Sequence, residues 1–406
     1  MRATPGPWAV VLAGMVALAV AMGIGRFAFT PILPMMMAEG QVDVPAASWL
    51  ASANYLGYLV GALLCTFQPW ISRAMGRQPL VHATPLVRGG LVATALLTVA
   101  MAVQVPAAWP VLRFASGVAS AVVFVYTSGW CLAQVARAGM PQLGGVMYTG
   151  PGVGIAISGL FASGMVAWHW KAATGWLIFG VLAAVLTASV WKVFQGDAAP
   201  AAAPVASAGP APAGAAGEMG WLALAYGLAG FGYIITATFL PVIARQAIPG
   251  SAWLDLFWPI FGVGVVLGAL ISSRIPGRGD RRWLLVGCYV IQALGIAVGI
   301  LSPTAPGFAI GSLLLGIPFT AITFFGMQEV RRLKPAQAPS YIGLLTALYG
   351  IGQIIGPPLA AAILARSATQ AAGFTTSLEV AAVALLTGAA MYAAMVKLFP
   401  LPKNKT

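Results

Sequence analysis

Twelve long apolar stretches constrain this chain more than any other feature of its sequence. About 20 apolar residues, coiled as a helix, cross the roughly 30 Å hydrocarbon core of a membrane. Of the 406 residues 60% are hydrophobic and only 7% charged, so the chain lacks the charged surface of a soluble domain. The stretches cover residues 8–37, 48–70, 80–103, 107–137, 143–167, 172–194, 219–244, 252–273, 283–302, 308–330, 341–364 and 372–398. We therefore predict an all-α membrane protein with twelve transmembrane helices, because a lipid-exposed backbone must bond to itself.

The net charge is +13, and the basic residues responsible for it lie mainly on one side of the predicted membrane topology. With a cytoplasmic N-terminus, sixteen of the 21 basic residues fall inside and three outside (Lys171, Arg245 and Arg366), while Arg26 and Arg113 lie within spans. This asymmetry is the positive-inside pattern, with both termini cytoplasmic. The charge therefore does not indicate a nucleic-acid partner. The high Ala and Gly content favours a bacterial source, and hence the cytoplasmic (inner) membrane.

The chain divides into two similar halves. Residues 196–218 are mostly Ala, Pro, Gly and Ser, a composition typical of a flexible linker that builds no core. We predict one six-helix bundle over 1–195 and a second over 219–406. A shift of 207 residues aligns Gly23 with Gly230 and Pro34 with Pro241, and the same ungapped register holds into the next span. Parallel repeats of this kind are typical of secondary transporters with the substrate site between the halves.

Local motifs resemble those of the major facilitator superfamily over essentially the whole chain. Leu112-Arg113-Phe-Ala-Ser-Gly117 resembles its Arg-x-x-x-Gly pattern in span four, and Gly150-Pro151-Gly152-Val153-Gly154 resembles its span-five motif, associated mostly with proton antiporters. Residues 73–77 stand at the family's loop motif, but Arg73 replaces the usual Asp, which weakens any argument from the family's gating charges. Residues 23–34, Gly-Ile-Gly-Arg-Phe-Ala-Phe-Thr-Pro-Ile-Leu-Pro, resemble the signature of the YbfB/YjiJ branch. The resemblance implies alternating access between two pseudo-symmetric bundles.

Two arginines inside the spans carry the sharpest functional signal. A charge at membrane depth is costly unless it faces protein or water and finds a partner. The resemblance places the spans of Arg26 and Arg113 around a central cavity. Of the eight acids only Glu379 falls well within a span; the others are placed in loops, in the linker or at span ends: Glu39, Asp43, Asp197, Glu218, Asp255, Asp280 and Glu329. Because arginine binds carboxylates well, the partner of these cations is predicted to be a small organic anion. The alternative is that backbone carbonyls and hydroxyls satisfy either arginine.

Further polar side chains in the spans complete the predicted site. Tyr233 stands at the repeat position of Arg26, so we expect it to face the same cavity, and Gln353 follows Tyr349 by one helical turn. Predicted substrate contacts are Arg26, Thr30, Arg113, Tyr126, Tyr233, Tyr349 and Gln353. Predicted gating or coupling residues are Arg113, Gly117, Gly150, Pro151, Gly154, Asp255 and Glu379. Ordinary interhelical hydrogen bonding and packing is the alternative for each.

The sequence indicates a transporter rather than an enzyme. It contains no Gly-Lys-Ser/Thr nucleotide motif, no Ser-His-Asp arrangement and no pair of buried carboxylates. We expect no cofactor and no metal site, and a monomer in the lipid bilayer. The leading interpretation is a secondary carrier of a small organic anion, with a proton as a candidate coupling ion. A proton-coupled efflux carrier for hydrophobic compounds is the alternative, and a membrane sensor or assembly factor is a third.

Overall fold

The computed structural model describes residues 5–76, 83–195, 215–251, 253–275 and 279–401. Within these ranges twelve helical segments are long and apolar enough to cross a membrane. Most of the predicted linker, and the basic residues Arg2, Arg77, Arg278, Lys403 and Lys405, lie outside the described residues.

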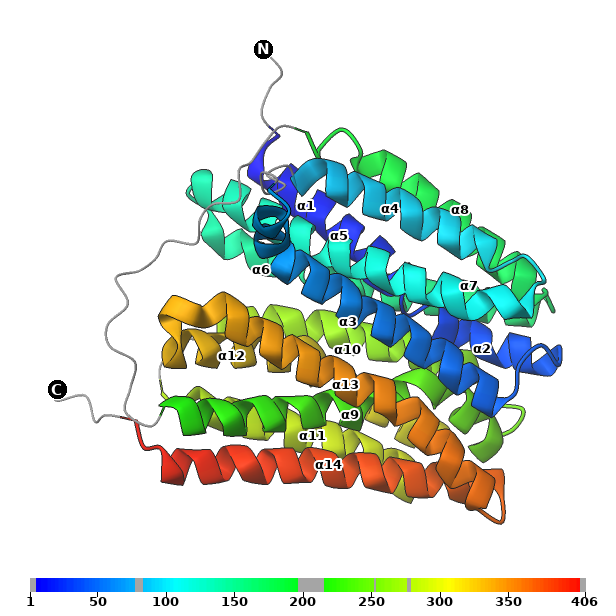
Figure 1. Cartoon of the computed structure of the whole chain (residues 1–406). Coiled ribbons are helices and arrows are strands. Elements are labelled where there is room, and N and C mark those ends of the chain that lie inside the picture. The colour runs from blue at the N-terminus through cyan, green and yellow to red at the C-terminus, as the bar shows by residue number, and fades with distance from the viewer. Residues whose placement is uncertain (1–4, 77–82, 196–214, 252, 276–278, 402–406) are drawn as a thin grey trace.

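The first bundle holds the six spans before the linker, the upper half of Figure 1. Its helices are α1 (Pro7–Leu18), a π-helical turn η1 (Ala19–Ile24), α2 (Phe29–Ala38), α3 (Val44–Ala74), α4 (Ala83–Ala100), η2 (Pro106–Ala108), α5 (Trp109–Arg137), η3 (Pro141–Leu143), α6 (Gly144–Met147), α7 (Gly150–Ala167) and α8 (Ala172–Val190). Span one is thus α1, η1 and α2 in series, and span five is α6 followed by α7.

The second bundle holds the remaining six spans, the lower half of Figure 1. Its helices are α9 (Ala215–Ala247), η4 (Leu254–Leu256), α10 (Phe257–Arg274), α11 (Arg281–Leu301), α12 (Ala305–Leu333), η5 (Pro335–Gln337), α13 (Ala338–Arg366) and α14 (Gln370–Leu398). The halves meet where α3 packs against α13, α7 against α10 and α2 against α9. The predicted fold, twelve spans in two pseudo-symmetric six-helix bundles, is confirmed.

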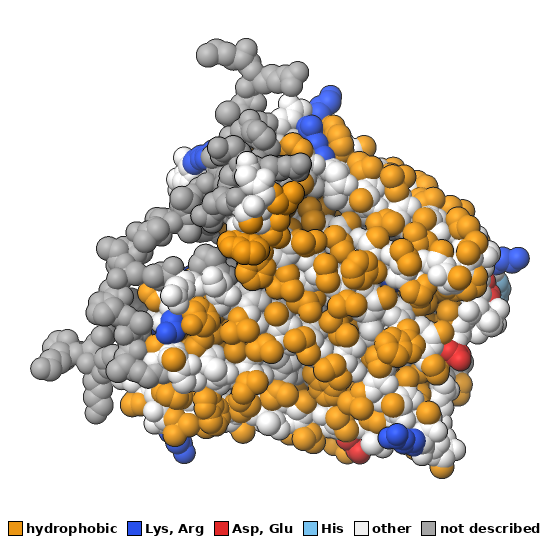
Figure 2. Space-filling model, in the orientation of Figure 1, with side chains coloured by type: hydrophobic (Ala, Val, Ile, Leu, Met, Phe, Trp, Pro, Cys, Tyr) orange, Lys and Arg blue, Asp and Glu red, His pale blue; other side chains and the backbone are white. Residues whose placement is uncertain are grey.

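The outer surface is apolar, as lipid requires. Hydrophobic side chains cover most of the face seen in Figure 2, and nearly all of the Lys, Arg, Asp and Glu side chains in view lie near its edges. Large apolar residues such as Leu96, Val111 and Val383 are each more than 55% exposed. In water such a surface would aggregate, but in a bilayer the acyl chains cover it.

One boundary differs from the prediction. Helix α9 begins at Ala215, so the placement of Glu218 in the linker is wrong. The reason is electrostatic, because Glu218 is 3% exposed and pairs with Arg282 and Arg332 of the second bundle. Pro151, a predicted gating or coupling residue, stands in the first turn of α7, where a missing N–H disturbs no helical bond.

Glycines set the distance between span one and α7. A Cβ built on Gly154 would lie 2.5 Å from the carbonyl oxygen of Ala19 and 2.7 Å from the Cα of Gly23. Both are backbone atoms, which cannot turn aside as a side chain can. Gly117 plays the same part between α5 and the Asn54 backbone of α3. These glycines therefore permit backbone-to-backbone packing, the usual driving contact between membrane helices.

We predict that Gly154→Ala lowers the free energy of unfolding by about 1–3 kcal/mol, because its methyl group overpacks the contact with η1. The matched control is Gly129→Ala on α5, where an added Cβ has no neighbour within 4 Å. That change should be neutral or stabilise by about 0.5–1 kcal/mol, as Ala is the better helix former. Thermal unfolding in detergent measures both variants. Equal melting of Gly154→Ala and wild type would contradict the packing argument.

Candidate functional site

Span one is broken where it passes the centre of the first bundle. In η1 the backbone N–H of Gly25 bonds the carbonyl of Val20 at 2.9 Å, and that of Phe27 bonds Met22 at 3.1 Å, one residue longer than α-helical spacing. A turn over residues 25–28 follows before α2 begins. Pro31 lacks the N–H that would bond the carbonyl of Phe27. Discontinuous helices in transporters mark places where backbone carbonyls become available to other groups.

Arg113 of α5 binds the carbonyls at this break. Its Nη1 donates to the carbonyl of Gly25 at 3.3 Å and its Nη2 to that of Arg26 at 3.1 Å. The Ser116 hydroxyl also donates to Gly25 at 2.8 Å, and Asn54 of α3 donates to the carbonyl of Arg113 itself at 2.9 Å. Arg113 is 2% exposed. These contacts match the alternative in which backbone carbonyls accept the hydrogen bonds of the arginine. A substrate contact for Arg113 stays a prediction.

Arg26 lies at the interface between the bundles with a neutral partner. Its Nη2 donates to Oε1 of Gln353 on α13 at 2.6 Å. Its Cζ lies 4.2 Å from the ring centroid of Tyr58, 5.2 Å from Tyr55 and 5.3 Å from Phe27, within cation–π range. Its buried Nε has no hydrogen-bond partner. Among the described residues, no carboxylate pairs with this guanidinium.

Gln353 of the second half bonds to both Arg26 and Tyr233, the two residues that stand at equivalent positions of the repeat. Its Oε1 accepts from Arg26, while its Nε2 donates to the hydroxyl of Tyr233 on α9. The Tyr233 ring stacks on Tyr349 with centroids 5.8 Å apart and meets the edge of Phe319 at 5.1 Å. Arg26 and Tyr233 therefore approach the same Gln353 side chain from opposite halves, while their place in a common substrate cavity stays a prediction. We call Arg26, Gln353 and the rings of Tyr55, Tyr58, Tyr233 and Tyr349 the central site.

Hydrogen bonds between the bundles close the central site toward the ends of α2 and α9. The Thr30 hydroxyl donates to the carbonyl of Ala237 at 2.8 Å, and the hydroxyls of Tyr55 and Thr238 lie 3.0 Å apart. Toward the opposite ends of these helices, α3 packs closely against α13. A Cβ built on Gly343 of α13 would lie 3.3 Å from the Thr66 side chain of α3. Contacts between the bundles therefore lie on both sides of Arg26.

The other predicted site residues lie elsewhere. Tyr126 is half-buried on α5 and has no recorded contact with the central site. Asp255 in η4 forms an ion pair with Arg245. Glu379 is exposed on the outer face of α14. Gly150 and Gly154 pack α7 against span one. A gating or coupling role for these residues stays a prediction.

Sequence reasoning missed the rings around Arg26. Tyr55 and Tyr58 stand one helical turn apart on α3, and Phe27 follows Arg26 directly. The spacing of the two tyrosines places them on one helix face, which was a usable signal. It did not say which neighbour that face meets. The contact with Arg26 depends on the tertiary fold.

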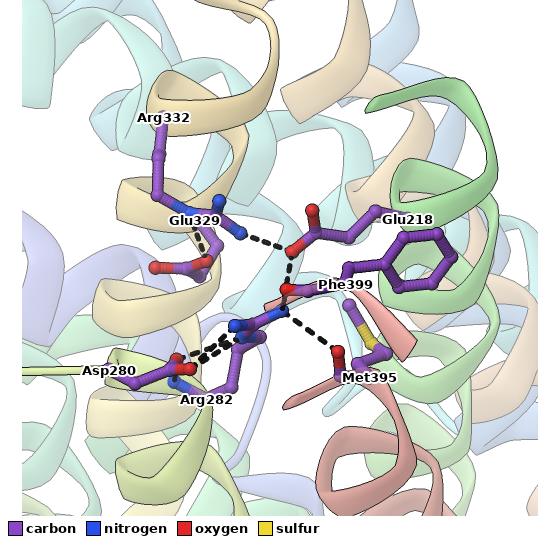
Figure 3. A network of polar contacts seen from close by, with 7 residues as sticks. All are labelled: Glu218, Asp280, Arg282, Glu329, Arg332, Met395 and Phe399. Carbon is purple, nitrogen blue, oxygen red and sulfur yellow. Dashed lines mark hydrogen bonds and ion pairs between the residues drawn. The ribbon is translucent and has the colours of Figure 1, made fainter. Parts of the chain in front are cut away.

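A second polar cluster, also missed, joins four helix ends of the second bundle (Figure 3). Arg282 at the start of α11 is its centre, with Nη1 2.9 Å from Glu218 and Nη2 2.6 Å from Asp280. Arg282 also donates to the carbonyls of Met395 and Phe399 at the end of α14. From α12, Arg332 pairs with Glu218 and, at 2.8 Å, with Glu329. We call these five charged side chains the helix-end cluster; it fastens α9, α11, α12 and α14 together.

We predict that Arg282→Met destabilises the fold by about 3–5 kcal/mol, because it leaves buried carboxylates without their cation. The control is the adjacent Arg281→Met, which removes the same charge from a side chain outside the helix-end cluster. Thermal unfolding of both purified variants tests this. A loss of similar size in the two variants would show that net charge, and not the cluster, is responsible.

The contribution of Asp280 to the stability of the helix-end cluster depends on pH. Burial raises the pKa of its carboxyl, but the hydrogen bonds and positive charge of Arg282 outweigh burial and hold the pKa below the ordinary 3.8. A lowered folded pKa means that the ionised carboxylate stabilises the fold above the unfolded pKa. That contribution disappears as pH falls through the lower folded value.

We therefore expect wild type to be more stable than Asp280→Asn near neutral pH. The difference should shrink as the pH falls below about 4, since the folded state loses its advantage as Asp280 protonates. Unfolding temperatures of both proteins over this pH range give the measurement. A difference that does not change with pH would contradict a role for the ionised carboxylate.

Curated relatives match only short segments. Efflux pump patC of Aspergillus clavatus is 29% identical over 131 residues, 31% of this chain and 24% of that protein. MFS-type transporter patC of Penicillium expansum is 29% identical over 113 residues, 27% of this chain and 21% of that protein. Efflux pump DEP3 of Fusarium langsethiae is 28% identical over 130 residues, 30% and 23% of the two chains. The matches span about a quarter or less of these relatives.

Solved structures share the whole fold. A point mutant of nucleoside transporter NupG has a TM-score of 0.73 at 15% identity, covering 95% of this chain and 99% of its own. Another NupG structure has a TM-score of 0.68, also at 15% identity, covering 98% and 99%. The family model described as "Uncharacterised MFS-type transporter YbfB" matches residues 18–393. The chain therefore belongs to this YbfB-type family of major facilitator transporters, as the signature around Arg26 indicates.

Proposed function

We propose that this transporter is a secondary carrier of a small organic anion, such as a carboxylate, and that Arg26 binds the anion. The observation that carries the proposal is a buried guanidinium at the bundle interface whose one polar side-chain partner among the described residues is the neutral amide of Gln353. A buried charge without a counter-charge is costly, and a substrate anion supplies that counter-charge.

Gln353 stands where a substrate carboxylate would bind. Its Oε1 makes a single 2.6 Å bond to Arg26 and leaves the Nε of Arg26 without a partner. A carboxylate offers two oxygens and a full negative charge. Both bonds are made by the charged guanidinium, but only the carboxylate adds an opposite charge and a second acceptor oxygen. The anion therefore competes with Gln353 for Arg26.

This exchange links binding to movement of the halves. Arg26 belongs to the first bundle, and Gln353 and Tyr233 belong to the second, so loss of the Gln353 bond removes a tie between the bundles. Three further hydrogen bonds, Thr30 to Ala237, Tyr55 to Thr238 and Ser52 to Ile354, must also break before the interface between the bundles opens. A ligand shifts such an equilibrium only by its difference in affinity for the two states.

Coupling and topology extend the proposal. An anion carried together with a proton makes a carrier proton-coupled although the central site has no carboxylate of its own. Asp255 is paired with Arg245 and Glu379 is exposed, and neither contacts the central site. We infer that the protein works as a monomer in a bacterial cytoplasmic membrane. The lysine and arginine asymmetry supports cytoplasmic termini.

Proton-coupled efflux of hydrophobic compounds is the second candidate. The names of the fungal relatives support it, as do the many rings at the central site. The charge at Arg26 is the discriminating feature. A cationic compound next to Arg26 would bring two positive charges together in a poorly screened site.

We predict that carboxylates, but not organic cations or neutral sugars, stabilise the purified protein. At 100 times its dissociation constant a ligand adds about 2.7 kcal/mol, which a thermal-shift screen resolves. Arg26→Ala should abolish the shift. Gln353→Glu should also abolish it, because its own carboxylate occupies Arg26, whereas Gln353→Ala should keep it.

Two controls make the screen decisive. Arg366→Ala removes an exposed cation at the end of α13 and should leave the shift intact. Arg113→Ala should lose folded protein with or without ligand, because it frees the carbonyls of the broken span. Stabilisation by cations that survives Arg26→Ala would overturn the anion proposal and favour efflux.

A further inference from the structure

A groove on the outer side of the first bundle has no role in the proposed transport. It lies between α4 and α8, which run side by side at the edge of the first bundle farthest from the second in Figure 1. Its volume is about 430 Å³, within the range of small-molecule sites. Val92 and Leu96 of α4 and Ala184 and Ala188 of α8 form its apolar walls. Leu96 is 64% exposed, so the groove opens to the membrane-facing surface.

One end of the groove is basic. Lys192 lines it and is exposed, two residues after α8 ends. Arg88 of α4 reaches across to the same place, where its Nη2 donates to the carbonyl of Trp191 at 2.8 Å and its Cζ lies 4.7 Å from the Trp191 ring. Within the described residues neither cation has an ion pair. Tryptophan and basic side chains at a span end are typical of the membrane–water interface.

Two buried polar atoms here lack partners. Thr187 lines the groove and is 5% exposed, yet its Oγ1 makes no hydrogen bond. The Nε of Arg88 is also buried without a partner. A buried polar atom normally finds a partner, so both indicate a ligand with acceptor oxygens near the basic end.

We propose that this groove binds one anionic phospholipid, with its phosphate on Arg88 and Lys192 and one acyl chain along α4 and α8. The basic end supplies the counter-charge for the phosphate. The Thr187 hydroxyl lies where it can donate a hydrogen bond to a glycerol ester oxygen. The apolar walls of α4 and α8 extend from Thr187 along the path of the acyl chain. Basic pockets between helices near the membrane surface bind anionic headgroups in this way.

The experiment measures phospholipid retained by the full-length protein after detergent purification, by native mass spectrometry with added phosphatidylglycerol or phosphatidylcholine. Each basic group near an anionic surface contributes about a factor of five, so Arg88→Gln with Lys192→Gln should weaken retention of phosphatidylglycerol about 30-fold. The matched control is Lys171→Gln with Arg366→Gln, two exposed cations at other span ends, which should retain the lipid.

A variant that fills the groove tests whether an acyl chain is bound there, and not only an anionic group. Ala184→Trp leaves both cations in place but occupies the path of the acyl chain, so it should also release phosphatidylglycerol. Equal retention of phosphatidylcholine and phosphatidylglycerol by wild type would overturn the proposal. Retention that Ala184→Trp leaves unchanged would also overturn it. Thermal stabilisation by inorganic phosphate equal to that by the lipid would do the same, because it would indicate a site for the ion alone. None of these readouts depends on the transported solute.

Discussion

The hydrogen bonding of the broken first span is the constraint on which the centre of this transporter depends. Inside a membrane a carbonyl that loses its helical donor must find another. At the break, Gly25 and Arg26 lose theirs, and Arg113 with Ser116 replaces them. Arg113 therefore supplies hydrogen-bond donors to the backbone of the broken span. Its engagement there fixes the turn that carries Arg26, and through the turn it sets where the Arg26 guanidinium meets the second bundle.

The two halves repeat in sequence but differ at this point. Pro34 has its counterpart in Pro241, whereas Pro31 corresponds to Thr238, which keeps its N–H. Accordingly α9 is continuous where span one is broken. The Thr238 hydroxyl instead contacts Tyr55 of the first bundle. The repeat also replaces the Arg26 charge with the neutral Tyr233. The central site thus has one cation at a pair of equivalent positions, and that asymmetry is the basis for proposing an anionic ligand.

The spans could be predicted from sequence because length and hydropathy are local properties, and the repeat register placed Arg26 opposite Tyr233 correctly. The break in span one could not be predicted, since η1 is as apolar as the helix it interrupts. Glu218 was misplaced for a related reason. It follows the linker directly in sequence, and its partners Arg282 and Arg332 lie 64 and 114 residues away. Long-range charge pairs of this kind leave no periodic pattern.

Arg26 and Arg282 show two ways of burying the same cation. Arg282, with a side chain that is fully inaccessible, has paired carboxylates and two backbone carbonyls around it, so every donor has a strong acceptor. Such a site has no place for another anion, and its role is to hold helix ends together. Arg26 is almost as buried but has an amide, three rings and a free Nε. Of these two buried cations, only Arg26 lacks a carboxylate partner among the described residues. That difference is the reason for proposing Arg26 as the place where an anion binds.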